Sequence, residues 1–186
     1  MAVLLAAGHS RRWGPGNKLF THVAGRTMVA RTLAIARAAP VQRLIVATGW
    51  QRERLADAAR GPRTTVVRVA RPEEGLGASL RAVHAALRPR EREVLLFLAD
   101  MPWIDPAAAA RLVRVARGRD RIVRPAWRGR PGHPVLLRGA ALDVLAHTRG
   151  DAGPGRKGAR LTPGDARCVF DLDRPGRAGR RPPALR

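Results

Sequence analysis

Basic and small residues gather directly after the first apolar segment of the sequence. The stretch from Ala6 to Leu19 reads Ala-Ala-Gly-His-Ser-Arg-Arg-Trp-Gly-Pro-Gly-Asn-Lys-Leu. Small residues at a strand end let a ligand approach the backbone, and free amides in a glycine-rich turn bind phosphate oxygens. Arg12 and Lys18 add positive charge there, one as a planar fork and the other as a point charge. The segment therefore indicates a site for a phosphate chain, although it lacks the Gly-Lys-Ser/Thr of a Walker A loop.

Three residue types that are rare in this chain occur in or near this segment. All but two of the 36 lysine and arginine residues are arginine, Asn17 is the single asparagine, and Ser10 and Ser79 are the only serines. A chain whose composition drifts towards arginine keeps a lysine most readily where arginine cannot serve. We therefore expect Lys18 to be functional rather than part of a basic surface loop.

An aspartate follows the most apolar segment of the chain. Val94–Leu98 contains five apolar residues without alternation, as a central parallel strand requires, and Ala-Asp-Met-Pro comes next. The carboxylate of Asp100 suits Mg²⁺, which takes one or two carboxylates plus substrate phosphates. Aspartate is also common as a cap of a turn, so this residue alone leaves both interpretations open.

Alternating strands and helices must position these residues. Apolar runs predict strands at 2–5, 44–47, 65–69, 94–98, 122–123, 134–137 and 168–171. Helical spacing and capping residues predict helices at 28–39, 50–59, 79–87, 105–116 and 140–145. Strands separated by helices favour a parallel sheet covered on both faces, with ligands beyond the carboxyl ends of the strands. We therefore expect the loops after Leu5 and Leu98 to carry the site.

Composition and charge exclude several classes of protein. The chain has 186 residues and 45% hydrophobic content, which is ordinary for a globular protein, and its apolar runs are far shorter than the ~18 residues of a membrane span. A single cysteine, Cys168, excludes an internal disulfide, and we expect a cytoplasmic protein without a membrane partner. The net charge of +22 makes a non-enzymatic nucleic-acid-binding protein the rival from another class. Nucleic acid is the less favoured partner because the arginines are spread along the chain and aromatic residues make up only 4%.

The first loop resembles the signature of nucleotidyltransferases of the molybdenum cofactor type. Their pattern is Leu-Ala-(Ala/Gly)-Gly-x-Ser-x-Arg-x-Gly-x-x-(Asn/Asp)-Lys, and residues 5–18 match every fixed position. Residues 99–102, 132–135 and 170–175 resemble three further segments of that family, and residues 150–160 resemble its Gly-Asp-x-Gly-Ala-Arg loop with an interruption. The resemblance implies a three-layer, Rossmann-like α/β fold with a mainly parallel central sheet. It implies a domain over residues 1–175, and the Arg/Pro-rich residues 176–186 predict a disordered tail.

The resemblance also implies a reaction and roles for named residues. A phosphate monoester attacks the α-phosphorus of a nucleoside triphosphate, pyrophosphate leaves, and Mg²⁺ is the cofactor. The implied catalytic residues are Arg12 and Lys18, the implied metal ligands are Asp100, Asp171 and Asp173, and the implied acceptor-side residues are Gly132 and His133. The implied nucleotide-binding residues are Leu5, Ala6, Ala7, Gly8, Ser10, Gly14, Asn17, Gly77 and Ser79.

Two residue pairs favour CTP as the nucleotide. In the family, the guanylyl-transferring branch tends to have Gly-Gly at the strand end and aspartate before the lysine, whereas this chain has Ala7-Gly8 and Asn17-Lys18. GTP remains the alternative. The implied acceptor is a molybdopterin-type cofactor, with a sugar phosphate still open, and a molybdoenzyme or its chaperone is the implied downstream partner. The family's acidic C-terminal segment is replaced here by basic residues, so a degenerate transferase fold acting as a sensor or chaperone is a third hypothesis.

Overall fold

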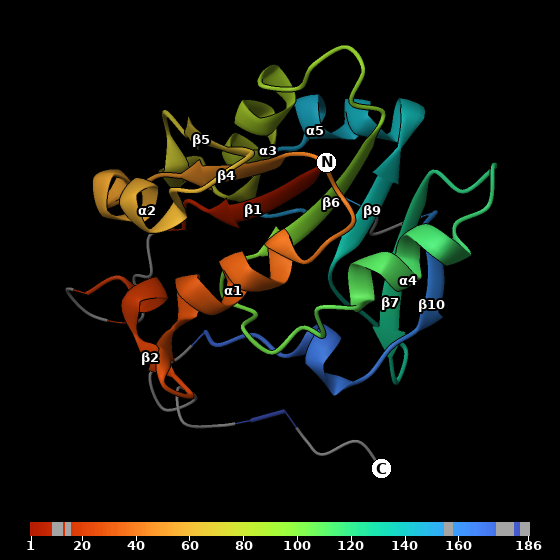
Figure 1. Cartoon of the computed structure of the whole chain (residues 1–186). Helices are drawn as coiled ribbons and strands as arrows, with labels where there is room; N and C mark the ends of the chain where they lie inside the picture. The colour runs from red at the N-terminus through yellow and green to blue at the C-terminus, as the bar shows by residue number, and fades with distance from the viewer. Residues whose placement is uncertain (9–12, 14–15, 155–157, 174–180, 183–186) are drawn as a thin grey trace.

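One sheet occupies the centre of the molecule in the computed structural model, which describes residues 1–8, 13, 16–154, 158–173 and 181–182 (Figure 1). Its strand order is β10-β7-β9-β6-β1-β4-β5, with β8 paired to β7. The strands are β1 (Ala2–Ala6), β4 (Leu44–Thr48), β5 (Thr64–Arg68), β6 (Glu93–Leu98), β7 (Ile122–Trp127), β8 (Arg130–Pro131), β9 (Val135–Arg138) and β10 (Arg160–Pro163).

Most neighbouring strands of the sheet are parallel. The pairs β5–β4, β4–β1, β1–β6 and β10–β7 are parallel, whereas β9 runs antiparallel to both β6 and β7, and β8 runs antiparallel to β7. The prediction of a mainly parallel central sheet is therefore confirmed. The strands β1 and β6 lie side by side in register, with Leu5 opposite Leu98, so their carboxyl ends open at the same edge.

Helices cover both faces of the sheet and make the predicted three layers. They are α1 (Met28–Arg37), α2 (Arg52–Ala59), α3 (Leu76–Ala85), α4 (Ala108–Val115) and α5 (Asp143–His147). Alternate residues of β1 enter two separate cores, because side chains along a strand point to opposite faces. Leu4 packs in one core with Leu33 of α1, and Leu5 packs in the other with Leu80 of α3. The helices α3 and α5 pack together on the second face (Figure 1).

The structure corrects two of the predicted elements and contains others that the sequence did not predict. Residues 168–171 are not a strand, because Asp165 caps a short 3₁₀ helix, η5 (Ala166–Val169), through a bond from the backbone N–H of Arg167 to its carboxylate. No apolar run marks strand β10 or the small hairpin of β2 (His22–Val23) and β3 (Arg26–Thr27), so these strands were not predicted. The predicted helix at 140–145 begins instead as a 3₁₀ turn, η4 (Gly139–Leu142), and continues as α5.

Two sequence expectations concern the membrane and the C-terminal region. Within the described residues, no helix is both long enough and apolar enough to cross a membrane. The tail predicted over 176–186 lies outside the described residues apart from 181 and 182.

Candidate active site

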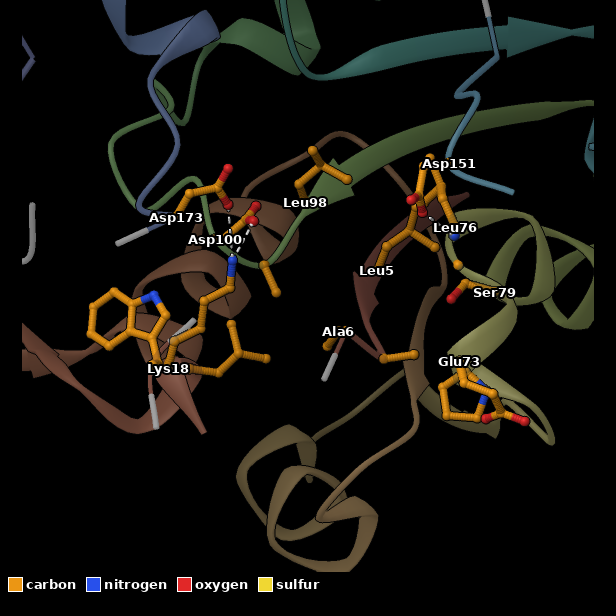
Figure 2. Close-up of a pocket in the computed structure, with 17 residues that line it drawn as sticks. Leu5, Ala6, Lys18, Glu73, Leu76, Ser79, Leu98, Asp100, Asp151 and Asp173 are labelled. Atoms are coloured by element: carbon orange, nitrogen blue, oxygen red, sulfur yellow. Dashed lines mark hydrogen bonds and ion pairs between the residues drawn. The ribbon is translucent and has the colours of Figure 1, made fainter. Parts of the chain in front are cut away.

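A cavity of about 420 Å³ lies at the carboxyl ends of β1 and β6 (Figure 2). This volume falls within the roughly 300–1,000 Å³ typical of small-molecule sites. The ends of the two strands are tied together, because the backbone N–H of Ala99 donates to the carbonyl of Leu5 over 3.1 Å. The described lining residues are Leu5, Ala6, Ala7, Gly8, Trp13, Lys18, Leu19, Pro72, Glu73, Gly75, Leu76, Ser79, Leu98, Ala99, Asp100, Asp151 and Asp173.

A short capped turn delivers Lys18 to the cavity. Residues Lys18–Phe20 form the 3₁₀ helix η2, and the side-chain oxygen of Asn17 accepts a 3.0 Å hydrogen bond from the backbone N–H of Leu19. Asparagine is well suited to capping a helix start. Leu19 is buried in the core below, which fixes the turn from the other side. Asn17 therefore positions Lys18, and it is not among the residues that line the cavity.

The Lys18 ammonium meets two carboxylates. Its Nζ atom lies 2.7 Å from Oδ2 of Asp100 and 3.3 Å from Oδ1 of Asp173 (Figure 2). Asp100 follows β6, and the backbone N–H of Leu172 donates to the Asp100 carbonyl over 3.0 Å. The fully buried Leu172 anchors the chain at this point, so Asp173 faces Lys18. Asp171 does not line the cavity.

The charge of the cavity contrasts with that of the whole protein. Although the chain carries +22, the described part of the lining holds one cation, Lys18, and four carboxylates, Glu73, Asp100, Asp151 and Asp173. Burial lowers the pKa of Lys18, but the charges of Asp100 and Asp173 and their hydrogen bonds more than offset this, so the pKa lies above its ordinary value. The ammonium is therefore charged at neutral pH. A triphosphate in this cavity needs further positive charge to offset the carboxylates.

The donor set at Asp100 and Asp173 fits a divalent metal ion. Carboxylate oxygens are the hard ligands that Mg²⁺ and Mn²⁺ prefer, and a catalytic Mg²⁺ is commonly held by one or two carboxylates plus phosphate oxygens. Both carboxylates lie within hydrogen-bond distance of one cationic atom, at the edge of a cavity with room for phosphates. No group of three or more metal-ligating side chains occurs among the described residues, so the remaining ligands would come from water and substrate.

The opposite end of the cavity is built on the N-terminus of α3. Ser79 is 5% exposed, and its hydroxyl points into the cavity (Figure 2). The backbone N–H of Leu76 donates to Oδ1 of Asp151 over 3.1 Å, and that of Gly77 donates to the carbonyl of Gly150 over 2.8 Å. The loop that contains Asp151 is thus fastened to the start of α3.

Glycine at position 77 is required by this packing. A Cβ atom there would lie 2.5 Å from the carbonyl oxygen of Thr148 and 2.9 Å from Cα of Arg149, and both atoms belong to backbone. Gly77 does not line the cavity. The structure explains the glycine at this position by the close approach of α3 to the loop at Thr148 and Arg149. Its predicted contact with the nucleotide stays a prediction.

The predicted acceptor-side residues lie apart from the main cavity. Gly132 packs against Cys168, and the backbone N–H of His133 donates to the carbonyl of Cys168 over 2.7 Å. His133 and Cys168 border a second cavity of about 30 Å³. Burial, helped by the charge of Arg124, lowers the pKa of His133 to about 4, so its imidazole is neutral at physiological pH. A role on the acceptor side stays a prediction.

The structure thus groups some of the predicted site residues and not others. Eight of them line one cavity: Leu5, Ala6, Ala7, Gly8, Lys18, Ser79, Asp100 and Asp173. Arg12, Ser10 and Gly14 lie outside the described residues. Sequence reasoning missed Glu73 and Asp151. The resemblance of residues 150–160 to a family loop was a signal for Asp151, whereas the predicted residues Gly77 and Ser79 pointed to the region of Glu73 without selecting it.

Solved structures share this architecture and part of the sequence. Rv0371c from Mycobacterium tuberculosis H37Rv is 30% identical with a TM-score of 0.79, and the match covers 93% of this chain and 92% of that one. A structure of Rv0371c in complex with manganese has a TM-score of 0.73 at 28% identity, covering 92% and 90% of the two chains. A nucleotidyl transferase from Methanothermobacter thermautotroptrophicus, Mth528, is 27% identical with a TM-score of 0.70, covering 82% and 78%.

A curated relative matches part of the chain. The bifunctional protein GlmU of Symbiobacterium thermophilum is 35% identical over 117 residues, which is 61% of this chain. The match spans 24% of the length of GlmU, so that relative is much longer than the matched region. Residues 2–163 match the family of MobA-like NTP transferase domains, and these residues contain β1, Lys18, Asp100 and the strands of the sheet. With this match across most of its length, and with a fold shared with Rv0371c and Mth528, the chain belongs to the MobA-like NTP transferase domain family.

Proposed function

We propose that this protein is a Mg²⁺-dependent nucleotidyltransferase that moves CMP from CTP to a phosphorylated acceptor of the molybdopterin type. One observation carries the proposal. Lys18 from the loop after β1, Asp100 from the end of β6 and Asp173 from a segment far along the chain meet at one edge of a cavity of about 420 Å³. A cation beside two metal-suited carboxylates is the arrangement that transfer of a phosphate-linked group requires.

The reaction forms one bond and breaks one. An oxygen of the acceptor's phosphate attacks the α-phosphorus of CTP, the bond from that phosphorus to the oxygen bridging to the β-phosphate breaks, and pyrophosphate leaves with the electron pair. The obstacle is that two anions must meet while negative charge moves onto the leaving group. Catalysis of this kind depends mainly on positioning and electrostatic stabilisation, so no covalent nucleophile is needed.

The residues of the chain divide this work. Lys18 contacts the triphosphate and neutralises charge on the departing pyrophosphate, together with Arg12, which lies outside the described residues. Asp100 and Asp173 would hold Mg²⁺, which when bound would neutralise negative charge on the phosphates. The backbone from Leu5 to Gly8 lies along the nucleotide. A Cβ at Gly8 would meet nothing within 4 Å, which leaves open space for the ligand beside that backbone.

The choice of CTP rests on the residues at the strand end. Ala7 lines the cavity and is buried, so its methyl group occupies space that glycine would leave free. We infer that this narrows the base pocket in favour of a pyrimidine. The hydroxyl of Ser79, which points into the other end of the cavity, supports base or ribose binding there. GTP-dependent transfer and a sugar-phosphate acceptor are the alternative outcomes of the test below.

Pyrophosphate release tests the proposal. The protein with Mg²⁺ is given molybdopterin or a sugar phosphate, each with CTP, GTP, ATP or UTP in turn. The expected result is release that depends on Mg²⁺, CTP and molybdopterin and that is lost in Asp100→Asn. Arg114→Met, which changes an exposed residue of α4, serves as the matched control and keeps the rate. A clear GTP preference would replace CTP by the alternative nucleotide, and no release with any pair would contradict transferase activity.

A further inference from the structure

The position of the Lys18 ammonium has a consequence for how a metal ion can bind. The ammonium contacts both carboxylates, at 2.7 Å from Oδ2 of Asp100 and 3.3 Å from Oδ1 of Asp173. The side chain of Lys18 is 14% exposed, against 22% for Asp100 and 40% for Asp173. An ammonium has three N–H donors, so this single group can satisfy both acids at once. In this state the two carboxylates already have a cation as their shared partner.

A divalent ion held by the same pair would displace that ammonium. An ion held by Asp100 and Asp173 would use the two carboxylates that Nζ already contacts. Two cations only a few ångströms apart in a partly buried site repel each other strongly. The ammonium must therefore leave before the ion binds, and it needs a new anionic partner because its surroundings are partly dehydrated.

The rest of the described lining offers such a partner only once a ligand is present. Glu73 and Asp151 line the other end of the cavity, away from Lys18 (Figure 2). Leu5 and Ala6 at the end of β1 line the cavity between its two ends, where a triphosphate would bring several anionic oxygens (Figure 2). A phosphate chain is thus the group to which the ammonium can turn.

We propose that the Lys18 ammonium and the divalent ion compete for the Asp100–Asp173 pair, so that the ion binds tightly only when a triphosphate draws the ammonium away. The inference rests on the proposed function for the identity of the metal ligands. Lys18 then has two positions, on the carboxylates in the ligand-free protein and on the phosphates in the complex. Metal and nucleotide bind with positive coupling, and by linkage each raises the affinity for the other by the same factor.

Binding of Mn²⁺ alone to the nucleotide-free protein tests this competition. Electron paramagnetic resonance of the free ion gives the dissociation constant for the wild type, for Lys18→Met and for Lys18→Gln, which keeps a hydrogen-bond donor but loses the charge. We expect Mn²⁺ to bind at least about tenfold more tightly to both variants than to the wild type. If the ammonium leaves the carboxylates free in about one wild-type molecule in ten, the apparent affinity of the wild type for Mn²⁺ is about tenfold weaker. Arg114→Met removes the same charge far from the pair and should stay within about twofold of the wild type.

A second substitution locates the bound ion. In the Lys18→Met background, Asp100→Asn should abolish the gain in affinity. Mn²⁺ binding by Lys18→Met and Lys18→Gln that equals or falls below that of the wild type would overturn the proposal. A gain that survives Asp100→Asn would overturn it as well, since the ion would then be bound elsewhere.

Coupling to the nucleotide gives an independent readout on the wild-type protein. A CTP analogue with a methylene bridge between the α- and β-phosphates cannot release pyrophosphate. It should tighten Mn²⁺ binding to the wild type by more than it does for Lys18→Met, and equal coupling in both would refute the exchange. The titration without nucleotide is also separate from catalysis, so an absence of transfer contradicts the proposed function, whereas unchanged Mn²⁺ affinities contradict this inference.

Discussion

Replacing Lys18 by methionine should separate the catalytic contribution of the ammonium from its contribution to stability. Methionine keeps most of the side-chain volume and removes the charge that lies 2.7 Å from Asp100. Removing one preorganised charge from a transfer site costs about 10²–10³ in turnover. We therefore expect the rate of pyrophosphate release at saturating nucleotide to fall by about that factor.

The same substitution should lower stability by a smaller amount. An exposed ion pair contributes about 0–1 kcal/mol, and breaking a fully buried one costs about 3–5 kcal/mol. The Lys18 pair lies between these cases, and Asp173 adds little because its side chain is 40% exposed. A loss of about 1–3 kcal/mol in the free energy of unfolding corresponds to a fall of roughly 3–10 °C in melting temperature for a domain of this size.

The assay combines steady-state pyrophosphate release with melting followed by circular dichroism. Arg114→Met loses the same charge on the exposed face of α4 and should match the wild type in both measurements. Mn²⁺ should restore much of the melting temperature of Lys18→Met, because the ion replaces the lost charge. Turnover within about threefold of the wild type in a correctly folded Lys18→Met protein would refute the catalytic reasoning.

Three further predictions concern other parts of the structure. Ala7→Gly removes a methyl group from the cavity wall and should raise the ratio of GTP to CTP in kcat/KM by about tenfold, as measured by pyrophosphate release; an unchanged ratio would contradict the proposed base selection. Gly77→Ala places a Cβ 2.5 Å from the Thr148 carbonyl and should cost about 1–3 kcal/mol in urea unfolding, whereas Gly118→Ala, which meets nothing within 4 Å, should cost less than about 0.5 kcal/mol. The pKa of His133 is lowered to about 4, so the unfolded chain binds the proton more readily. The contribution of neutral His133 to the free energy of unfolding should therefore be complete above about pH 6.5 and should be lost as the pH drops towards 4. His133→Gln should flatten the dependence of the free energy of unfolding on pH over this range, and equal slopes in the two proteins would contradict the reasoning.

The central part of the site could be predicted from the sequence because it obeys a rule of parallel sheets. Residues that follow neighbouring strands meet at the carboxyl edge, which brought the loop of Lys18 and the turn of Asp100 together. The alternation of strands and helices could also be predicted from the sequence. At the start of α1, for example, the hydroxyl of Thr27 caps the helix, as this residue type predicts.

The missed features depend on contacts that local patterns do not record. Asp151 reaches the cavity because two bonds join its loop to α3: the backbone N–H of Gly77 donates to the Gly150 carbonyl, and that of Leu76 donates to the Asp151 carboxylate. Both bonds join residues that are far apart in the sequence, so no local pattern predicts them. Strand β10 lies at the edge of the sheet, where Leu161 is 49% exposed, so it lacks the apolar run that marks an inner strand. The polar cap at Asp165 overrode the apolar residues around Cys168 that suggested a strand there.

Two long-range interactions set the order in which the site can form. The backbone N–H of Leu172 donates to the Asp100 carbonyl, and Lys18 pairs with Asp173, which lies 155 positions further along the chain. On the ribosome, β1 and the turn of Lys18 emerge before Asp173, and a nascent chain that ends before residue 173 has only one of the two acids. Contacts between residues so far apart in the sequence form late in folding, because the chain loses the entropy of closing the loop before the contact can stabilise it. Unfinished chains therefore lack one of the two carboxylates proposed to hold the metal ion, and the proposed transfer activity can arise only after the sheet has formed.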